Sequence, residues 1–262
     1  MVSLQVQCHS SLLKTNVAIQ VLLPHPSREE SASERVSGND GFPVLYLLHG
    51  LSDDQSAWTR HSAIERHAEP HHMAVVMPAI GRSFCTDMQT GAKYGRFVAD
   101  ELPFLMKSLF PLSTRREDTF IAGLDMGGYG AFKTALTHPG RYAAAASLSG
   151  ALDLSTLYGL LDDEIKQEMA LVFGSWDDCV DNGHHLPDLL ERTVRAGTPL
   201  PRLFQCCGTE DFLLEDNRRF AAVAGRLNTG LQYREGTGAH DWSYWDAMLP
   251  KMLAWMHRVP GS

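Results

Sequence analysis

The stretch IAGLDMGGYGAF, residues 121–132, decides the fold of this chain. Its first residues complete the apolar run TFIAGL (119–124), which has the length and composition of a buried strand. The residues that follow, GAFKTAL (130–136), have the apolar spacing of a helix. Gly123 and Gly127 flank Asp125 at two residues on either side and leave room for close backbone approach. The stretch therefore predicts a strand, a sharp turn with Asp125 at its apex, and a helix.

The rest of the chain repeats this alternation of short apolar runs and helical stretches. Continuous apolar strands suit a sheet that is buried on both faces, and strands alternating with helices form a mostly parallel sheet. We therefore expect an α/β fold with helices on both faces of the sheet. The expected strands are 15–23, 44–48, 73–79, 119–124, 143–150, 202–208 and 231–236, and the expected helices are 96–110, 130–140, 217–227 and 244–258.

Two segments depart from this rhythm. Residues 151–200 contain helical and turn patterns without a convincing strand. About fifty residues would make a very small independent core, so we expect a helical insert or partial cap within a single domain, 1–262. The polar segment SREESASERVSGND (27–40) is predicted to be a surface loop between two strands.

Composition narrows the possible functions. The net charge of −8 is spread along 262 residues, so no basic patch favours nucleic acid or an anionic membrane. Five scattered cysteines without CxxC spacing suggest neither a disulfide framework nor a zinc site, and Cys206 and Cys207 should be buried thiols. The pairs His71–His72 and His184–His185 lack a third metal ligand and should be exposed. No apolar run or N-terminal pattern indicates a membrane span or signal peptide, so we expect a cytoplasmic protein without metal or cofactor.

The turn at 121–132 matches a catalytic motif at every position but one. In the motif G-x-S-x-G, a nucleophilic serine lies between a strand and a helix, and an acid and a histidine follow in that chain order. Here Asp125 holds the nucleophile position. Asp211 follows the strand 202–208, and His240 follows the strand 231–236. The order 125, 211, 240 predicts an active site at the carboxyl edge of the sheet.

Two further groups of residues would complete such a site. The main-chain amides of Leu51, after the strand 44–48, and of Met126 would form an oxyanion hole. His49 is expected to order the loop that carries Leu51. Four aromatic residues could line an acyl or alcohol pocket, although each could equally be a packing residue: Trp58, Tyr94, Trp176 and Trp242.

Four stretches together resemble the esterase D family: LLHGLSDDQSAW (47–58), GLDMGGYGAFKTAL (123–136), GTEDFLLEDN (208–217) and GAHDWSYW (238–245). The likeness runs from residue 1 to 258 and is to tributyrin, acetyl and feruloyl esterase-like members, with S-formylglutathione hydrolases more distant. It implies one α/β-hydrolase domain that cleaves small short-chain carboxylic esters without a cofactor, often as a homo-oligomer. It also implies that His240 is the base, Asp211 its orienting acid, and Leu51 and Met126 the oxyanion donors.

Asp125 departs from the family, which has Ser in G-L-S-M-G-G. A carboxylate attacks a carbonyl carbon poorly, its charge favours imidazolium at His240, and one of its oxygens can fill the oxyanion hole. We therefore predict an esterase scaffold whose usual chemistry is disabled, most simply an engineered variant of a serine enzyme. Two alternatives stay open. Asp125 could attack an sp3 carbon, as in haloalkane dehalogenases and epoxide hydrolases, or the chain could be a non-catalytic pseudoenzyme that binds a ligand.

Overall fold

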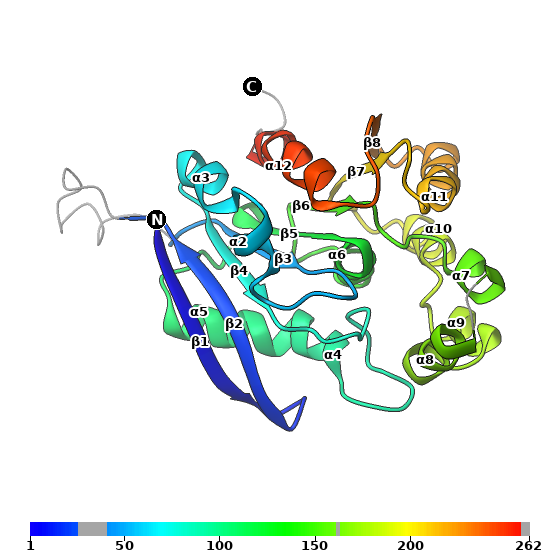
Figure 1. Ribbon diagram of the computed structural model, residues 1–262, viewed down its shortest axis with the longest axis horizontal. Helices are drawn as coiled ribbons and strands as arrows, with labels where there is room; N and C mark the ends of the chain where they lie inside the picture. Colours follow the sequence, from blue (N-terminus) through cyan, green and yellow to red (C-terminus); the bar gives the residue numbers. More distant parts are fainter. Residues whose placement is uncertain (26–40, 161–162, 258–262) are drawn as a thin grey trace.

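An eight-stranded sheet forms the centre of the computed structural model, which describes residues 1–25, 41–160 and 163–257 (Figure 1). The strand order is β1-β2-β4-β3-β5-β6-β7-β8. The pairs β1–β2 and β2–β4 are antiparallel, and every other neighbouring pair is parallel. The strands are β1 (Val2–Ser10), β2 (Thr15–Leu23), β3 (Val44–Leu48), β4 (Ala74–Pro78), β5 (Thr119–Leu124), β6 (Ala144–Leu148), β7 (Arg202–Gly208) and β8 (Gln232–Gly236). The mostly parallel sheet predicted from the sequence is confirmed.

Helices cover both faces of this sheet (Figure 1). One face is covered by α2 (Ala57–His61), α3 (Ile64–Ala68) and α12 (Trp242–His257). The other is covered by α4 (Tyr94–Arg96), α5 (Leu102–Leu109), α6 (Asp125–Thr137), α10 (Leu186–Arg195) and α11 (Leu214–Arg226). Short 3-10 helices lie at Glu69–His71 and Arg116–Asp118. In the described part of the chain, no helix has both the length and the apolar composition that crossing a bilayer requires.

The core has two halves, one on each side of the sheet. Side chains of a strand point alternately to opposite faces, and β3 shows this clearly. Tyr46 and Leu48 pack into one half, whereas Leu45 and Leu47 pack into the other. Both halves are fully buried along β3, which explains why its sequence is apolar throughout.

The segment between β6 and β7 is helical, as predicted for 151–200. It contains α7 (Leu154–Leu160), α8 (Asp163–Phe173), α9 (Trp176–Asp181) and α10, and no strand among its described residues, which omit 161–162. Backbone hydrogen bonds from Gln89 and Thr90 to the carbonyls of Val172 and Leu171 join α8 to the loop that follows β4. The loop predicted at 27–40 lies outside the described residues.

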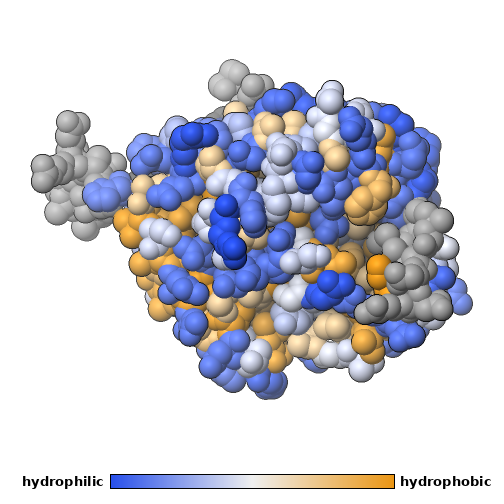
Figure 2. Space-filling model, in the orientation of Figure 1, coloured by the Kyte–Doolittle hydropathy of each residue, from blue (hydrophilic) through white to orange (hydrophobic). Residues whose placement is uncertain are grey.

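Two features of the fold differ from the sequence-based expectations. β1 was not expected, and it forms an edge strand that pairs only with β2. Apolar surface gathers over this hairpin, at the lower left of Figure 2. The single helix expected at 96–110 is broken into α4, a π-helix at Phe97–Glu101, and α5. Within the π-helix, Glu101 accepts hydrogen bonds from the amide and hydroxyl of Ser11 at 2.7 and 2.6 Å, and so ties the hairpin turn to this helix.

Candidate active site

The turn at Asp125 is sharp and has little free space around it. β5 ends at Leu124 and α6 begins at Asp125, whose φ of 50° is uncommon for a residue with a side chain. A Cβ on Gly123 would lie 2.3 Å from the carbonyl oxygen of Gly127, and a Cβ on Gly127 would lie 2.5 Å from that of His49. Both positions therefore require glycine, and the predicted strand–turn–helix is confirmed.

Three side chains from separate loops meet at the carboxyl edge of the sheet. Oδ1 of Asp125 lies 3.7 Å from Nε2 of His240. Nδ1 of the same imidazole lies 3.0 and 3.1 Å from the two carboxylate oxygens of Asp211. Asp211 follows β7 and His240 follows β8, so parallel neighbouring strands deliver both to the end of β5. The structure brings together the three residues that the sequence predicted.

The charges at this site favour an ionised imidazole. Burial by itself lowers the pKa of His240, but the hydrogen bond to Asp211 and the charges of Asp125 and Asp211 outweigh it and raise that pKa. Burial likewise raises the pKa of Asp211, whose side chain is 0% exposed, but hydrogen bonds from His240 and the Leu213 amide outweigh it and lower that pKa. The imidazole therefore lies between two carboxylates that both stabilise its protonated form.

A main-chain donor also contacts Asp125. The amide N–H of Leu51 donates a 2.9 Å hydrogen bond to Oδ2 of Asp125. Met126 follows in the first turn of α6, where amides have no acceptor within the helix. One oxygen of Asp125 thus accepts from the Leu51 amide, while the other is directed to the imidazole of His240.

His49 holds the loop that carries Leu51. Its Nδ1 lies 2.8 Å from the carbonyl oxygen of Gly50, and its Nε2 lies 3.0 Å from the amide nitrogen of Ile80. A carbonyl only accepts and an amide N–H only donates, so Nδ1 carries the proton and Nε2 accepts. Burial lowers the pKa of His49, which fits a neutral ring. These contacts fit the loop-ordering role expected from the sequence.

Arg82 links the same loop to α8, in the segment between β6 and β7. Its Nη1 donates to the carbonyl oxygen of Leu51 at 3.3 Å. Its Nη2 lies 2.6 Å from Oε2 of Glu168, and its Nε also pairs with that carboxylate. Glu168 lies on α8. Arg82 therefore connects Leu51, whose amide contacts Asp125, to the segment between β6 and β7.

The four aromatic residues proposed for a pocket lie in different places. Trp58 is 0% exposed and donates from Nε1 to the carbonyl of Leu48 at 3.0 Å, so it is a core residue and does not fit a pocket lining. Trp242 packs edge-on against Trp58 with ring centroids 5.1 Å apart. Trp176 of α9 packs against Tyr158 of α7. Tyr94, at the start of α4, is half-buried against the core.

Two other aromatic rings contact the imidazole directly. The ring centroid of Phe212 lies 4.5 Å from that of His240, although Phe212 is 74% exposed. Trp245 meets His240 edge-on at 5.0 Å and donates from Nε1 to Oγ of Ser149 at 3.0 Å. Sequence reasoning missed both residues. Their positions gave a signal, since Phe212 follows Asp211 directly and Trp245 ends the stretch GAHDWSYW.

The pair His184–His185 was expected to be exposed, and this is wrong. Both are half-buried on the turn between α9 and α10, and the carbonyl of His184 accepts a 2.6 Å hydrogen bond from the Tyr129 hydroxyl of α6. Burial and the nearby charge of Lys133 lower the pKa of His184 to about 4. Cys206 and Cys207 are buried as predicted, and burial raises the pKa of the Cys206 thiol to about 12.

The chain belongs to the Esterase family, whose sequence pattern matches residues 10–256. It is 28% identical to an acetyl esterase of Caldicellulosiruptor saccharolyticus, over 99% of both chains. It is also 28% identical to the diacylglycerol acyltransferase/mycolyltransferase Ag85B of Mycobacterium avium, over 82% of this chain and 75% of that protein. The esterase resemblance seen in the sequence is confirmed.

Solved structures agree with this assignment. FphF, a fluorophosphonate-binding serine hydrolase of Staphylococcus aureus, is 32% identical and superposes with a TM-score of 0.89, over 98% of this chain and 99% of that one. The S-formylglutathione hydrolase FrmB of the same organism is also 32% identical, with a TM-score of 0.86 and the same coverage. The fold is therefore that of the α/β-hydrolases.

Proposed function

We propose that this chain carries an esterase site for small-molecule carboxylic esters, and that Asp125 keeps this site from hydrolysing them. In this proposal Asp125 stands at the nucleophile position, His240 is the base, and Asp211 orients it. The amides of Leu51 and Met126 would stabilise the oxyanion. Relatives named as an acetyl esterase and an S-formylglutathione hydrolase support small acyl groups as substrates.

One observation carries the proposal: a single carboxylate engages both partners that catalysis needs. Oδ2 of Asp125 accepts from the Leu51 amide at 2.9 Å, and Oδ1 lies 3.7 Å from Nε2 of His240. A substrate carbonyl would have to displace an anion from the amide donor. The imidazolium that this anion favours cannot accept a proton from a nucleophile or a water molecule.

The chemistry of the carboxylate points the same way. A serine at this position would transfer its proton to His240, attack the carbonyl carbon and form an acyl ester that water then cleaves. Attack by Asp125 would instead form an anhydride, and the carboxylate is the weaker nucleophile towards that carbon. Loss of the nucleophile from such a triad lowers turnover by a factor on the order of 10⁶.

The variant Asp125→Ser tests this proposal, with p-nitrophenyl acetate and butyrate as substrates. We expect an acyl-enzyme burst and steady turnover, above the unchanged chain by a factor on the order of 10⁶. Asp125→Ala is the matched control, because it removes the charge without supplying a nucleophile. If the serine variant shows no burst and no more turnover than the alanine variant, the esterase proposal is wrong.

Attack of Asp125 on an sp3 carbon has less support. Haloalkane dehalogenases usually have tryptophan after the aspartate, and here that position is Met126, whose side chain is fully buried and has no N–H to offer a halide. Turnover of haloalkanes or epoxides in ¹⁸O-labelled water would place label in the Asp125 carboxylate if this chemistry occurred. We expect none.

A further inference from the structure

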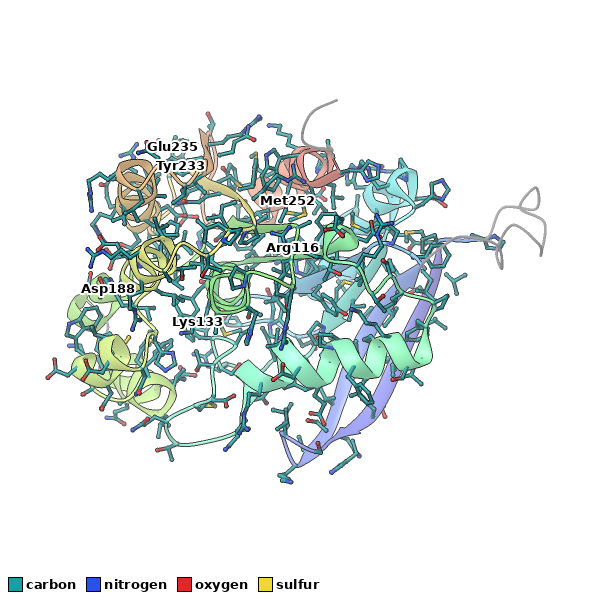
Figure 3. All side chains as sticks on the ribbon, turned by 180° about the vertical axis from the view of Figure 1, so that it is seen from behind. Arg116, Lys133, Asp188, Tyr233, Glu235 and Met252 are labelled. Carbon is teal, nitrogen blue, oxygen red and sulfur yellow. The ribbon has the colours of Figure 1, made fainter. Side chains whose placement is uncertain are left out.

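A cavity of about 440 Å³ lies at the edge of the sheet opposite to Asp125. It borders Thr119, the first residue of β5, whereas Asp125 follows the last residue of that strand. Pro103, Phe104 and Lys107 of α5 border the cavity, as does Arg116, which is labelled in Figure 3. No residue of the proposed esterase site lines it.

Positive charge dominates the lining of this cavity. Lys107, Arg116 and Arg141 border it, and among the lining residues that the structure describes Asp100 is the one acidic residue. Asp100 pairs with Arg141 at 2.6 Å, which leaves Lys107 and Arg116 in excess. Nε of Arg116 donates to the carbonyl of Pro139 at 3.4 Å, a neutral partner. Burial and the charge of Arg141 lower the pKa of Lys107.

We propose that this cavity binds a small molecule through a phosphate group, held by Lys107 and Arg116. A phosphate dianion matches the two excess cations, and its oxygens accept from guanidinium and ammonium donors alike. The volume lies within the range of small-molecule sites and exceeds the needs of phosphate alone. Phe104, 72% exposed on α5, offers an apolar wall for the organic part of the ligand.

Calorimetric titration of the full chain with inorganic phosphate, at constant ionic strength in chloride, tests the site. Lys107→Gln and Arg116→Gln should each weaken binding by about tenfold or more, since each removes a charge-assisted hydrogen bond. Arg115→Gln is the matched control: it removes the same charge one residue away, from a guanidinium that pairs with Asp118 outside the cavity. It should bind as the unchanged chain does. Equal affinity in all these chains, or an equal loss in Arg115→Gln, would overturn the proposal, as would the absence of binding.

A change of ligand completes the experiment. Glycerol phosphate that binds more tightly than free phosphate would identify a phosphorylated metabolite, and equal affinities would identify phosphate itself. Acetate that binds as tightly as phosphate would contradict a phosphate site.

Discussion

The amide of Leu51 donates to Oδ2 of Asp125 at 2.9 Å, so the anion at position 125 occupies a main-chain donor that lies on another loop. The same carboxylate raises the pKa of His240. The two effects share one source, the negative charge at the apex of the turn. A substitution that removes this charge and keeps the size of the side chain separates the effects of charge from the effects of shape.

Asp125→Asn should lower the pKa of His240, because the charge of Asp125 is one of the causes that raise it. Titration of the imidazole by NMR measures this, with His240→Gln assigning the resonance. Asp118→Asn, on the 3-10 helix just before β5 and therefore at the opposite end of that strand from Asp125, provides the control and should leave the pKa of His240 unchanged. An unaltered His240 pKa in Asp125→Asn would mean that the carboxylate does not act on the imidazole.

The same pair predicts how stability depends on pH. The pKa of His240 is raised in the folded state above the unfolded value of about 6.5, so its contribution is fully present below that pH and is lost as pH rises through the folded pKa. The unfolding free energy of the unchanged chain should therefore exceed that of the Asp125→Asn variant most clearly near about pH 6. The difference between the two should shrink towards about pH 9. Urea denaturation at both pH values measures it. A difference that grows with pH would have the wrong sign.

Asp211→Asn, introduced into the Asp125→Ser chain, should lower kcat by about 10⁴-fold, as loss of the orienting carboxylate does in a serine triad. The amide can still accept from the Leu213 amide, so the loop should stay folded. Asp241→Asn is the control, because it removes a charge next to His240 but no hydrogen bond to it. A loss in Asp241→Asn as large as that in Asp211→Asn would show that charge alone, and not orientation, is responsible.

Arg82→Ala in the Asp125→Ser chain should lower kcat by roughly tenfold with KM little changed, because Leu51 would lose the hydrogen bond that holds its carbonyl, in the peptide unit next to the one that carries the N–H donor. Glu168→Gln should act in the same direction and more weakly, since it leaves Arg82 in place. Arg96→Ala, which breaks an exposed ion pair with Asp87 nearby in the chain, should change neither constant. Steady-state kinetics with p-nitrophenyl acetate decides between these outcomes.

Gly127→Ala should destabilise the fold by about 3 kcal/mol or more, because its Cβ would lie 2.5 Å from the carbonyl oxygen of His49. Gly225→Ala is the opposite case. Gly225 lies inside α11 with nothing within 4 Å of an added Cβ, so alanine should stabilise the helix by about 0.5–1 kcal/mol. Circular dichroism in urea measures both. Equal effects in the two variants would contradict the close approach at the turn.

The parallel strands were predictable because they are buried on both faces and read as continuous apolar runs, as in β3 and β5. The site residues were predictable because such strands end at one edge, which brings Asp211 and His240 to Asp125. β1 was not predicted from the sequence, because it is a half-exposed edge strand and lacks a continuous apolar run. The contact between Phe212 and His240 joins two loops, and no local pattern encodes which ring of several will reach the imidazole.

The lack of space around Gly123 and Gly127 determines which substitutions the turn between them can accept. Backbone atoms of neighbouring segments fix the turn at Asp125, and the side chain of Asp125 contributes little to its conformation. We therefore expect aspartate and serine to exchange there with the surrounding backbone unaltered. On the function proposed above, a single replacement at position 125 would switch ester hydrolysis on or off without any change in the fold.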